Sequence, residues 1–215
     1  MMNKELLVKI LKNAAEIMNS NDFDEYEIVR MGGYDQNNPH HVYDLWGHTK
    51  NTVIEVLKSD YYSDNLAIAA LLHDIGKPDC AMNKNGITVF YGHAKKSAEI
   101  AEKLLTKWEF CKKDIDEICF YISHHDDFIN YRYNHEINPK NKAAKYFTEI
   151  NTANVYKYFE VTCKSDIGLF ASLIALCIAD ASSQADIAVC KNYSITKEEK
   201  ISKLVDIYKI ICHHI

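Results

Sequence analysis

The chain has 215 residues, a formal net charge of −5 at pH 7, and 47% hydrophobic residues. This length suits one domain, or two small ones, with a hydrophobic core. The lysine pairs at 95–96 and 112–113 are too small for the basic face of a general nucleic-acid binder, so we expect no long nucleic acid as a partner.

The cysteine pattern and the apolar runs indicate the cellular compartment of the protein. The seven cysteines are scattered without a CxxC pair, which favours reduced thiols in a cytoplasm. The start of the chain is interrupted by charges and lacks the apolar block of a signal peptide. The longest apolar run, IGLFASLIALCIA, is too short to cross a bilayer comfortably. We therefore expect a cytoplasmic protein without a membrane partner.

Helical periodicity recurs through most of the chain, which contains only seven glycines and three prolines. In chain order, we expect helices over 4–18, 48–58 and 64–76, with Asp64 as N-cap of the third and Gly76 at its end. Residues 22–44 are expected to be irregular, with a turn at MGGYDQNNP. The stretch CAMNKNGITVFYG predicts a β-hairpin with Asn85 and Gly86 in its turn.

The second half of the chain is also predicted to be mainly helical. We expect helices over 93–108 and 112–124, a loop over 126–139, shorter helices within 140–162, a long helix over 168–190 and a last one over 195–212. The sequence contains no repeat, low-complexity block or linker. The prediction is one all-α domain over 1–215, a helical bundle with one small hairpin.

Ionisable residues gather where apolar helix faces begin or end: His48, His73, Asp74, His93, His124 and His125. A helix bundle brings such ends together and builds its metal sites there. Imidazole and carboxylate suit zinc, iron, manganese or nickel better than calcium. A metal would also offset the cost of burying Asp74. The alternative is structural: His73 donates to a carbonyl and Asp74 pairs with a lysine, as is common for an isolated His-Asp pair.

Five motifs resemble, in order, those of HD-domain metal-dependent phosphohydrolases: WGHT, LLHDIGKP, FYGHAKKSAEIA, SHHD and IADASSQA. The upstream QNNPHHVYDLWGHT is similar to the entry to the HD domain of bacterial CCA-adding tRNA nucleotidyltransferases. The resemblance spans residues 34–212 and leaves 1–33 as an N-terminal helix and lead-in. No nucleotidyltransferase region precedes the motifs, so we expect a stand-alone HD hydrolase rather than a CCA-adding enzyme.

The resemblance implies that His48, His73 and Asp74 bind a metal together with a distal aspartate. Asp166 has the expected interval, whereas Asp180 has the closer local sequence. The two are separated by about 21 Å of predicted helix, so they cannot bind one ion. Asp180 falls on the apolar stripe of its helix, while Asp166 suits an N-cap, so we expect Asp180 to be the ligand.

The resemblance also implies roles around a second ion. Lys77 would meet the substrate phosphate, although a cation is also favoured at a helix C-terminus. His93, His124 and His125 match second-metal positions, which contact substrate instead in some one-metal relatives. We expect one or two divalent transition-metal ions (Fe, Mn, Ni, Zn or Co, with Mg also compatible), bridged by Asp74 when there are two. The expected catalytic residues are Asp74, Lys77 and His93.

These expectations predict a metal-dependent phosphohydrolase that cleaves a phosphomonoester or phosphodiester by metal-activated water. The substrate would be a nucleotide or another small phosphate compound. A di-iron oxygenase of HD type and a nucleotide-binding regulatory HD protein stay open as alternatives. No GxSxG, GxxxxGK[ST] or activated cysteine pattern is present. We assign no role to the remaining histidines, which are His40, His41, His135, His213 and His214.

Overall fold

The structure, a computed structural model, describes residues 2–137, 140, 142–190 and 193–214. Its first half contains α1 (Lys4–Ala14), η1 (Ser20–Asp22), α2 (Tyr26–Val29), α3 (Leu45–Lys58), α4 (Asp64–Leu72), α5 (Lys77–Cys80), β1 (Met82–Lys84) and β2 (Ile87–Val89). The central part contains α6 (His93–Lys107), α7 (Lys112–His124), η2 (Asp127–Asn130), β3 (Tyr131–Arg132), η3 (Asn134–Glu136), η4 (Lys142–Tyr146) and β4 (Thr148–Glu149). The chain continues through α8 (Thr152–Val161), α9 (Ile167–Ser182), β5 (Ile187–Cys190), β6 (Tyr193–Thr196) and α10 (Lys197–Cys212).

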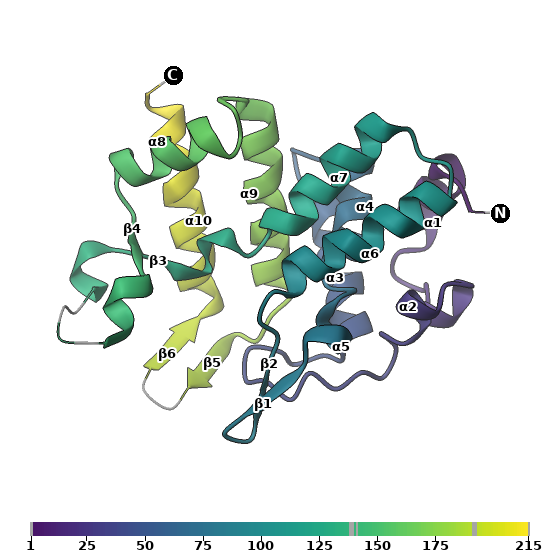
Figure 1. Cartoon of the computed structure of the whole chain (residues 1–215), viewed down its shortest axis with the longest axis horizontal. Coiled ribbons are helices and arrows are strands. Elements are labelled where there is room, and N and C mark those ends of the chain that lie inside the picture. The colour runs from purple at the N-terminus through teal and green to yellow at the C-terminus, as the bar shows by residue number, and fades with distance from the viewer. Residues whose placement is uncertain (1, 138–139, 141, 191–192, 215) are drawn as a thin grey trace.

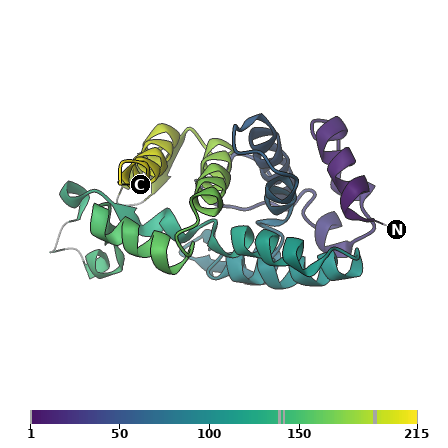
Figure 2. The same ribbon diagram turned by 90° about the horizontal axis from the view of Figure 1, so that it is seen from above.

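Helices dominate the described residues, and the strands form only two-stranded pairs, which confirms the predicted all-α class. Helix α4 lies at the centre, in contact with α1, α3, α6, α7 and α9 (Figure 1). Residues 65–72 of α4 are all buried, as expected for a helix that is apolar on every side. In Figure 2, α6 and α7 lie along one side of the molecule, with α1, α3, α9 and α10 along the other.

The predicted hairpin is confirmed. Strands β1 and β2 pair antiparallel, with Met82 opposite Val89. Asn85 and Gly86 both have positive φ, 58° and 85°, as the two central residues of a type I′ turn require.

The helix expected over 64–76 differs at both ends. Ser63, rather than Asp64, is its N-cap, because the Ser63 side chain accepts a hydrogen bond from the Leu66 amide. The helix ends at Leu72, and His73 is its C-cap. Pro78 lies in the first turn of α5, where a missing N–H costs nothing, so it starts a helix instead of following one.

The prediction of one long helix over 168–190 is wrong for its last third. Helix α9 ends at Ser182, and β5 pairs antiparallel with β6, with Ala188 opposite Ile195. The Ser183 hydroxyl donates to the carbonyl of Ala179, a local bond that competes with continuation of the helix. The following IAVC stretch is rich in residues that favour strands. Of the other predicted helices, the one over 112–124 has the expected bounds in α7, and the rest are present with one or both ends shifted.

Within the described ranges, none of the helices combines the length and the apolar character that a bilayer crossing requires.

Candidate metal centre

The end of α4 carries the His73-Asp74 pair, and its position depends on a glycine. A Cβ added at Gly76 would lie only 2.6 Å from the backbone nitrogen of Ser97 in α6. Glycine therefore permits the close approach, and its own N–H donates to the Ser97 hydroxyl at 2.9 Å. This contact holds the His-Asp pair beside the start of α6.

Four other helix ends point ionisable side chains at the same place. His48 lies in the first turns of α3, whose N-cap Asp44 accepts a hydrogen bond from Gly47 N at 2.7 Å. His93 is the first residue of α6, His125 is the C-cap of α7, and Asp180 lies in the last turn of α9. The bundle thus brings together residues that are far apart in the chain.

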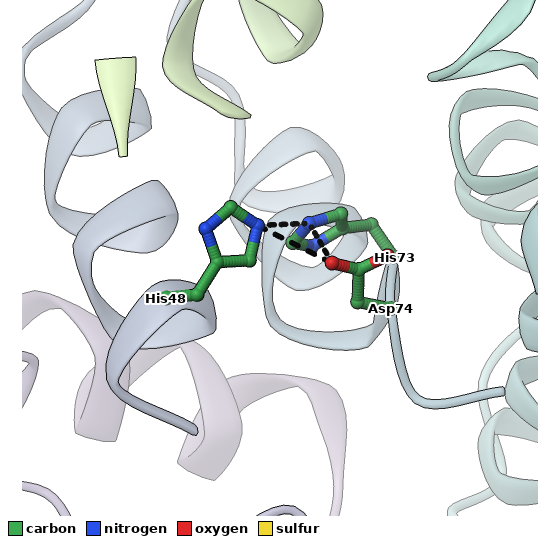
Figure 3. A group of neighbouring side chains, drawn as sticks. All are labelled: His48, His73 and Asp74. Atoms are coloured by element: carbon green, nitrogen blue, oxygen red, sulfur yellow. Dashed lines mark hydrogen bonds and ion pairs between the residues drawn. The ribbon is translucent and has the colours of Figure 1, made fainter. Parts of the chain in front are cut away.

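We call His48, His73, Asp74 and Asp180 the inner group; Figure 3 shows the first three. His48 Nε2 lies 3.2 Å from Asp74 Oδ2 and 3.0 Å from Asp180 Oδ1. His73 Nε2 lies 3.1 Å from Asp74 Oδ2 and 3.3 Å from His48 Nε2. Both imidazoles and Asp74 are at most 1% exposed, whereas the Asp180 side chain is 18% exposed. The inner group is therefore almost sealed, with Asp180 at its edge.

We call Asp74, His93 and His125 the outer group. The other carboxylate oxygen of Asp74, Oδ1, lies 3.2 Å from His93 Nε2 and 3.7 Å from His125 Nε2. The two Nε2 atoms lie 3.2 Å apart. Asp74 thus presents one oxygen to each group, the arrangement that a carboxylate bridging two ions would need. Each group contains three residues that could hold one ion.

The hydrogen bonds of the four histidine Nδ1 atoms leave the Nε2 lone pairs available to bind a metal. Each Nδ1 faces a backbone carbonyl: His48 to Ser183 at 3.2 Å, His73 to Ala70 at 2.8 Å, His93 to Phe90 at 2.9 Å and His125 to Ile122 at 2.7 Å. Because a carbonyl oxygen only accepts, each neutral ring carries its proton on Nδ1. The Nε2 lone pairs then converge with the carboxylates, and the Nδ1 bonds fix the rings as outer partners of metal-bound histidines do.

The raised pKa values of His48 and His125 favour protonated imidazoles beside the two carboxylates. Burial opposes charge on His48, but hydrogen bonds to Asp180 and Asp74 outweigh it and raise its pKa to about 9. Burial likewise opposes charge on His125, and Asp74 raises its pKa to about 9. Burial lowers the pKa of His73. Despite burial, neighbouring cationic groups hold the pKa values of Asp74 and Asp180 well below the usual range. Metal ligation needs neutral imidazole, so a divalent ion would take the place of these protons.

A cavity of about 500 Å³ opens onto this site. Asp74, Lys77 and Asp180 lie in its wall, together with the histidines of the outer group. The lining also contains aromatic and aliphatic side chains, among them Phe128, Tyr131, Ile195, Leu204 and Ile207. Apolar walls with a few convergent polar groups are typical of small-molecule sites.

The structure does not bring two of the candidate residues to this centre. His124 Nδ1 lies 2.6 Å from Asp127 Oδ2, and the His124 side chain is 31% exposed. It belongs to neither group, so of the His-His pair only His125 joins the cluster. Asp166 is the N-cap of α9, where its Oδ1 accepts from Leu169 N at 2.9 Å, at the opposite end of the helix from Asp180.

The polar residues around the site that had no assigned role in the sequence analysis include Gln36, His41, Asp126 and Gln184. Asp126 lines the cavity, with its carboxylate 3.9 Å from His93 Nδ1. Gln184 Nε2 lies 3.2 Å from the Oδ1 atom of Asp180, one helical turn earlier. That spacing of four residues was a usable signal, because such residues are neighbours on a helix surface. Gln36 and His41 surround Lys77, a contact across an irregular segment that no periodicity indicates.

A family model of the HD domain matches residues 52–149, somewhat less than half of the chain. The matched range contains His73, Asp74, Lys77, His93 and His125 but neither His48 nor Asp180. No curated protein matches this chain. The closer resemblance to CCA-adding enzymes stays a prediction. Residues 52–149 are thus similar to the HD domain, and the structure shows a His/Asp cluster that could hold a divalent metal.

Proposed function

We propose that this chain is a metal-dependent phosphohydrolase acting on a small phosphoester. The observation that carries the proposal is the convergence of four imidazole Nε2 atoms on two carboxylates, Asp74 and Asp180, which line the cavity. The HD-domain match gives independent support.

The inner group would hold one ion through His48, His73, Asp74 and Asp180. The outer group would hold a second through His93, His125 and the other oxygen of Asp74. Such ions, when bound, lower the pKa of water and stabilise charge on phosphate oxygens. The protein's own contribution is to orient the ligands, because each ring is fixed by its Nδ1 bond and Asp180 by Gln184.

The cavity supports a small substrate. Its volume of about 500 Å³ lies within the range of small-molecule pockets. A mononucleotide or another compact phosphoester, with its phosphate at the His/Asp wall and its organic part against Phe128 and Leu204, is the class that we propose. The positive charge of Lys77, near the same wall, favours an anionic group there.

Elemental analysis followed by a substrate panel tests the proposal. Purified protein is loaded separately with Mn²⁺, Fe²⁺, Co²⁺, Ni²⁺, Zn²⁺ or Mg²⁺ and assayed with phosphomonoesters, cyclic nucleotides and linear diesters. We expect hydrolysis with at least one metal and its loss with a chelator. Oxygen uptake by the iron-loaded protein without phosphoester cleavage would favour the oxygenase instead. Nucleotide binding without turnover would favour a regulatory protein.

A further inference from the structure

Lys77 is the buried cation nearest the centre, and all three of its ammonium protons have acceptors. Its Nζ lies 2.7 Å from Asp74 Oδ2, 2.9 Å from Gln36 Oε1 and 3.3 Å from His41 Nε2. The residue is only 5% exposed. An ammonium group has three N–H donors, so a direct bond from Lys77 to a phosphate would require the loss of one of these partners.

The two neutral acceptors are themselves held in place. Gln36 is 1% exposed, and its Nε2 faces the carbonyl of Tyr43 at 3.4 Å, which turns Oε1 toward Lys77. Lysine only donates, so His41 Nε2 accepts and the His41 ring is neutral. The His41 ring also lies edge-on to that of His48, with centroids 5.1 Å apart.

The segment that carries both acceptors, residues 36–41, is fixed at two points. On one side, Thr88 N of the hairpin donates to the carbonyl of Asn37 at 3.0 Å. On the other side, Ala185 N, just after α9, donates to the carbonyl of His40 at 2.9 Å. The acceptors of Lys77 are therefore set by a segment that the fold holds rigidly, and it lies outside the HD-domain match.

We infer that Gln36 and His41 are positioning residues of the metal centre. They hold Lys77 as an internal counter-cation of Asp74, and Lys77 acts through that carboxylate instead of touching the substrate phosphate. The direct-contact role expected for Lys77 is thereby replaced by an orienting one. This inference rests on the proposed metal centre but not on any particular substrate.

Calorimetric titration of the full chain with Mn²⁺ tests the inference without an activity assay. Gln36→Met keeps the length of the side chain but removes the acceptor. Loss of a direct partner of a metal ligand weakens binding by about 10–100-fold, and Gln36 lies one contact further out, so we expect a loss of about tenfold for Gln36→Met. His41→Leu should weaken Mn²⁺ binding in the same direction, whereas His41→Gln, which keeps an acceptor, should bind nearly as the wild type does.

Val42→Ala is the matched control. It shortens a side chain that is 63% exposed and adjacent in sequence to His41. We expect wild-type Mn²⁺ affinity from this variant. Thermal melts identify any variant that fails to fold, and the Gln36 and His41 variants provide independent tests of the same contact.

A second titration, with inorganic phosphate on Mn²⁺-saturated protein, separates positioning from substrate contact. Lys77→Gln should bind phosphate nearly as the wild type does once the metal site is saturated. A direct contact would instead cost phosphate affinity about tenfold or more. A loss of phosphate affinity in Lys77→Gln would overturn this inference but not the proposed function. Wild-type Mn²⁺ affinity in a folded Gln36→Met variant would do the same. Failure of the wild type to bind Mn²⁺ or any other divalent transition metal would overturn the proposed function as well.

Discussion

The inner and outer groups share Asp74 but differ in their surroundings. The imidazoles of His48 and His73 are at most 1% exposed, and the distances among their Nε2 atoms and the Asp74 oxygen are 3.1–3.3 Å. In the outer group, the His93 side chain is 14% exposed, and His125 Nε2 lies 3.7 Å from Asp74. The inner imidazoles are therefore built into the core, whereas His93, His125 and Asp180 line the cavity.

This difference predicts two unequal metal sites. The inner group offers four ligands, two of them imidazoles that are at most 1% exposed, whereas the outer group offers three, so the inner site should be the tighter one. The outer site, next to the cavity, would meet the substrate and exchange its ion more readily. The following variants break or sharpen this distinction, from the largest expected effect to the smallest.

Asp74→Asn should abolish both sites, because each group uses one of its oxygens. We expect metal content near zero and turnover lower by on the order of 10³-fold, since the stabilisation by bound ions is worth several kcal/mol. Elemental analysis and a hydrolysis assay measure the two effects. The matched control is Asp79→Asn. It weakens the ion pair between Asp79 in α5 and Arg30, and the variant should keep its metal. Full occupancy in Asp74→Asn would refute the bridging role.

Asp180→Asn should weaken the inner site selectively. Loss of a charged ligand should lower inner-site affinity by at least about tenfold, judging from the cost of losing even an outer partner. Asp166→Asn should change stability by less than about 1 kcal/mol and leave the metals bound, because asparagine caps helices nearly as well as aspartate. Metal titration and denaturant unfolding together distinguish the effects of Asp180→Asn and Asp166→Asn. The opposite pattern would assign the ligand to Asp166.

His93→Ala and His125→Ala should each empty the outer site and leave the inner ion bound. The expected stoichiometry falls from two ions per chain toward one. His124→Ala is the matched control, because its ring pairs with Asp127 away from the cluster. A fully active wild type that saturates at one ion would contradict the outer metal site and reassign His93 and His125 to substrate contact.

Glu25→Gln should lower stability without altering either site. Glu25 Oε1 accepts hydrogen bonds from Trp108 Nε1 and Lys107 Nζ, both at 3.0 Å. Burial opposes the charge, but these donors outweigh it and lower the Glu25 pKa. We expect a loss of about 1 kcal/mol at pH 7. Because the pKa of Glu25 is lowered in the folded state, the stability difference between wild type and variant should have its full size well above about pH 4.5. It should shrink as the pH falls through the lowered pKa.

Denaturant unfolding of the wild type and Glu25→Gln at several pH values measures that difference. A change in metal stoichiometry would show that this contact is coupled to the centre.

The sequence predicted the all-α class, the β1–β2 hairpin and the two helix ends that carry His93 and His125, because these depend on local signals. Apolar periodicity located the helices, and Asn85-Gly86 specified the turn. The family motifs indicated which histidines belong together. The assignment of the ligands to metals stays a prediction.

What the sequence missed depended on tertiary contacts or on competing local bonds. The side-chain bonds of Ser63 and Ser183 set helix ends that periodicity alone misplaced. Gln36 and His41 reach Lys77 through an irregular segment fixed by the hairpin and by the end of α9. Likewise, no pattern in the SHHD motif says that His124 turns to Asp127 while His125 turns to Asp74.

The proposed ligands come from the ends of α3, α4, α6, α7 and α9, which meet only in the folded chain. An ion held there would bind the native state and not the dispersed unfolded chain. Its binding energy is then linked to unfolding: an ion at 100 times its dissociation constant adds about 2.7 kcal/mol to the stability of the native state. The melting temperature should therefore rise with metal concentration, so a thermal melt becomes a binding assay that needs no substrate.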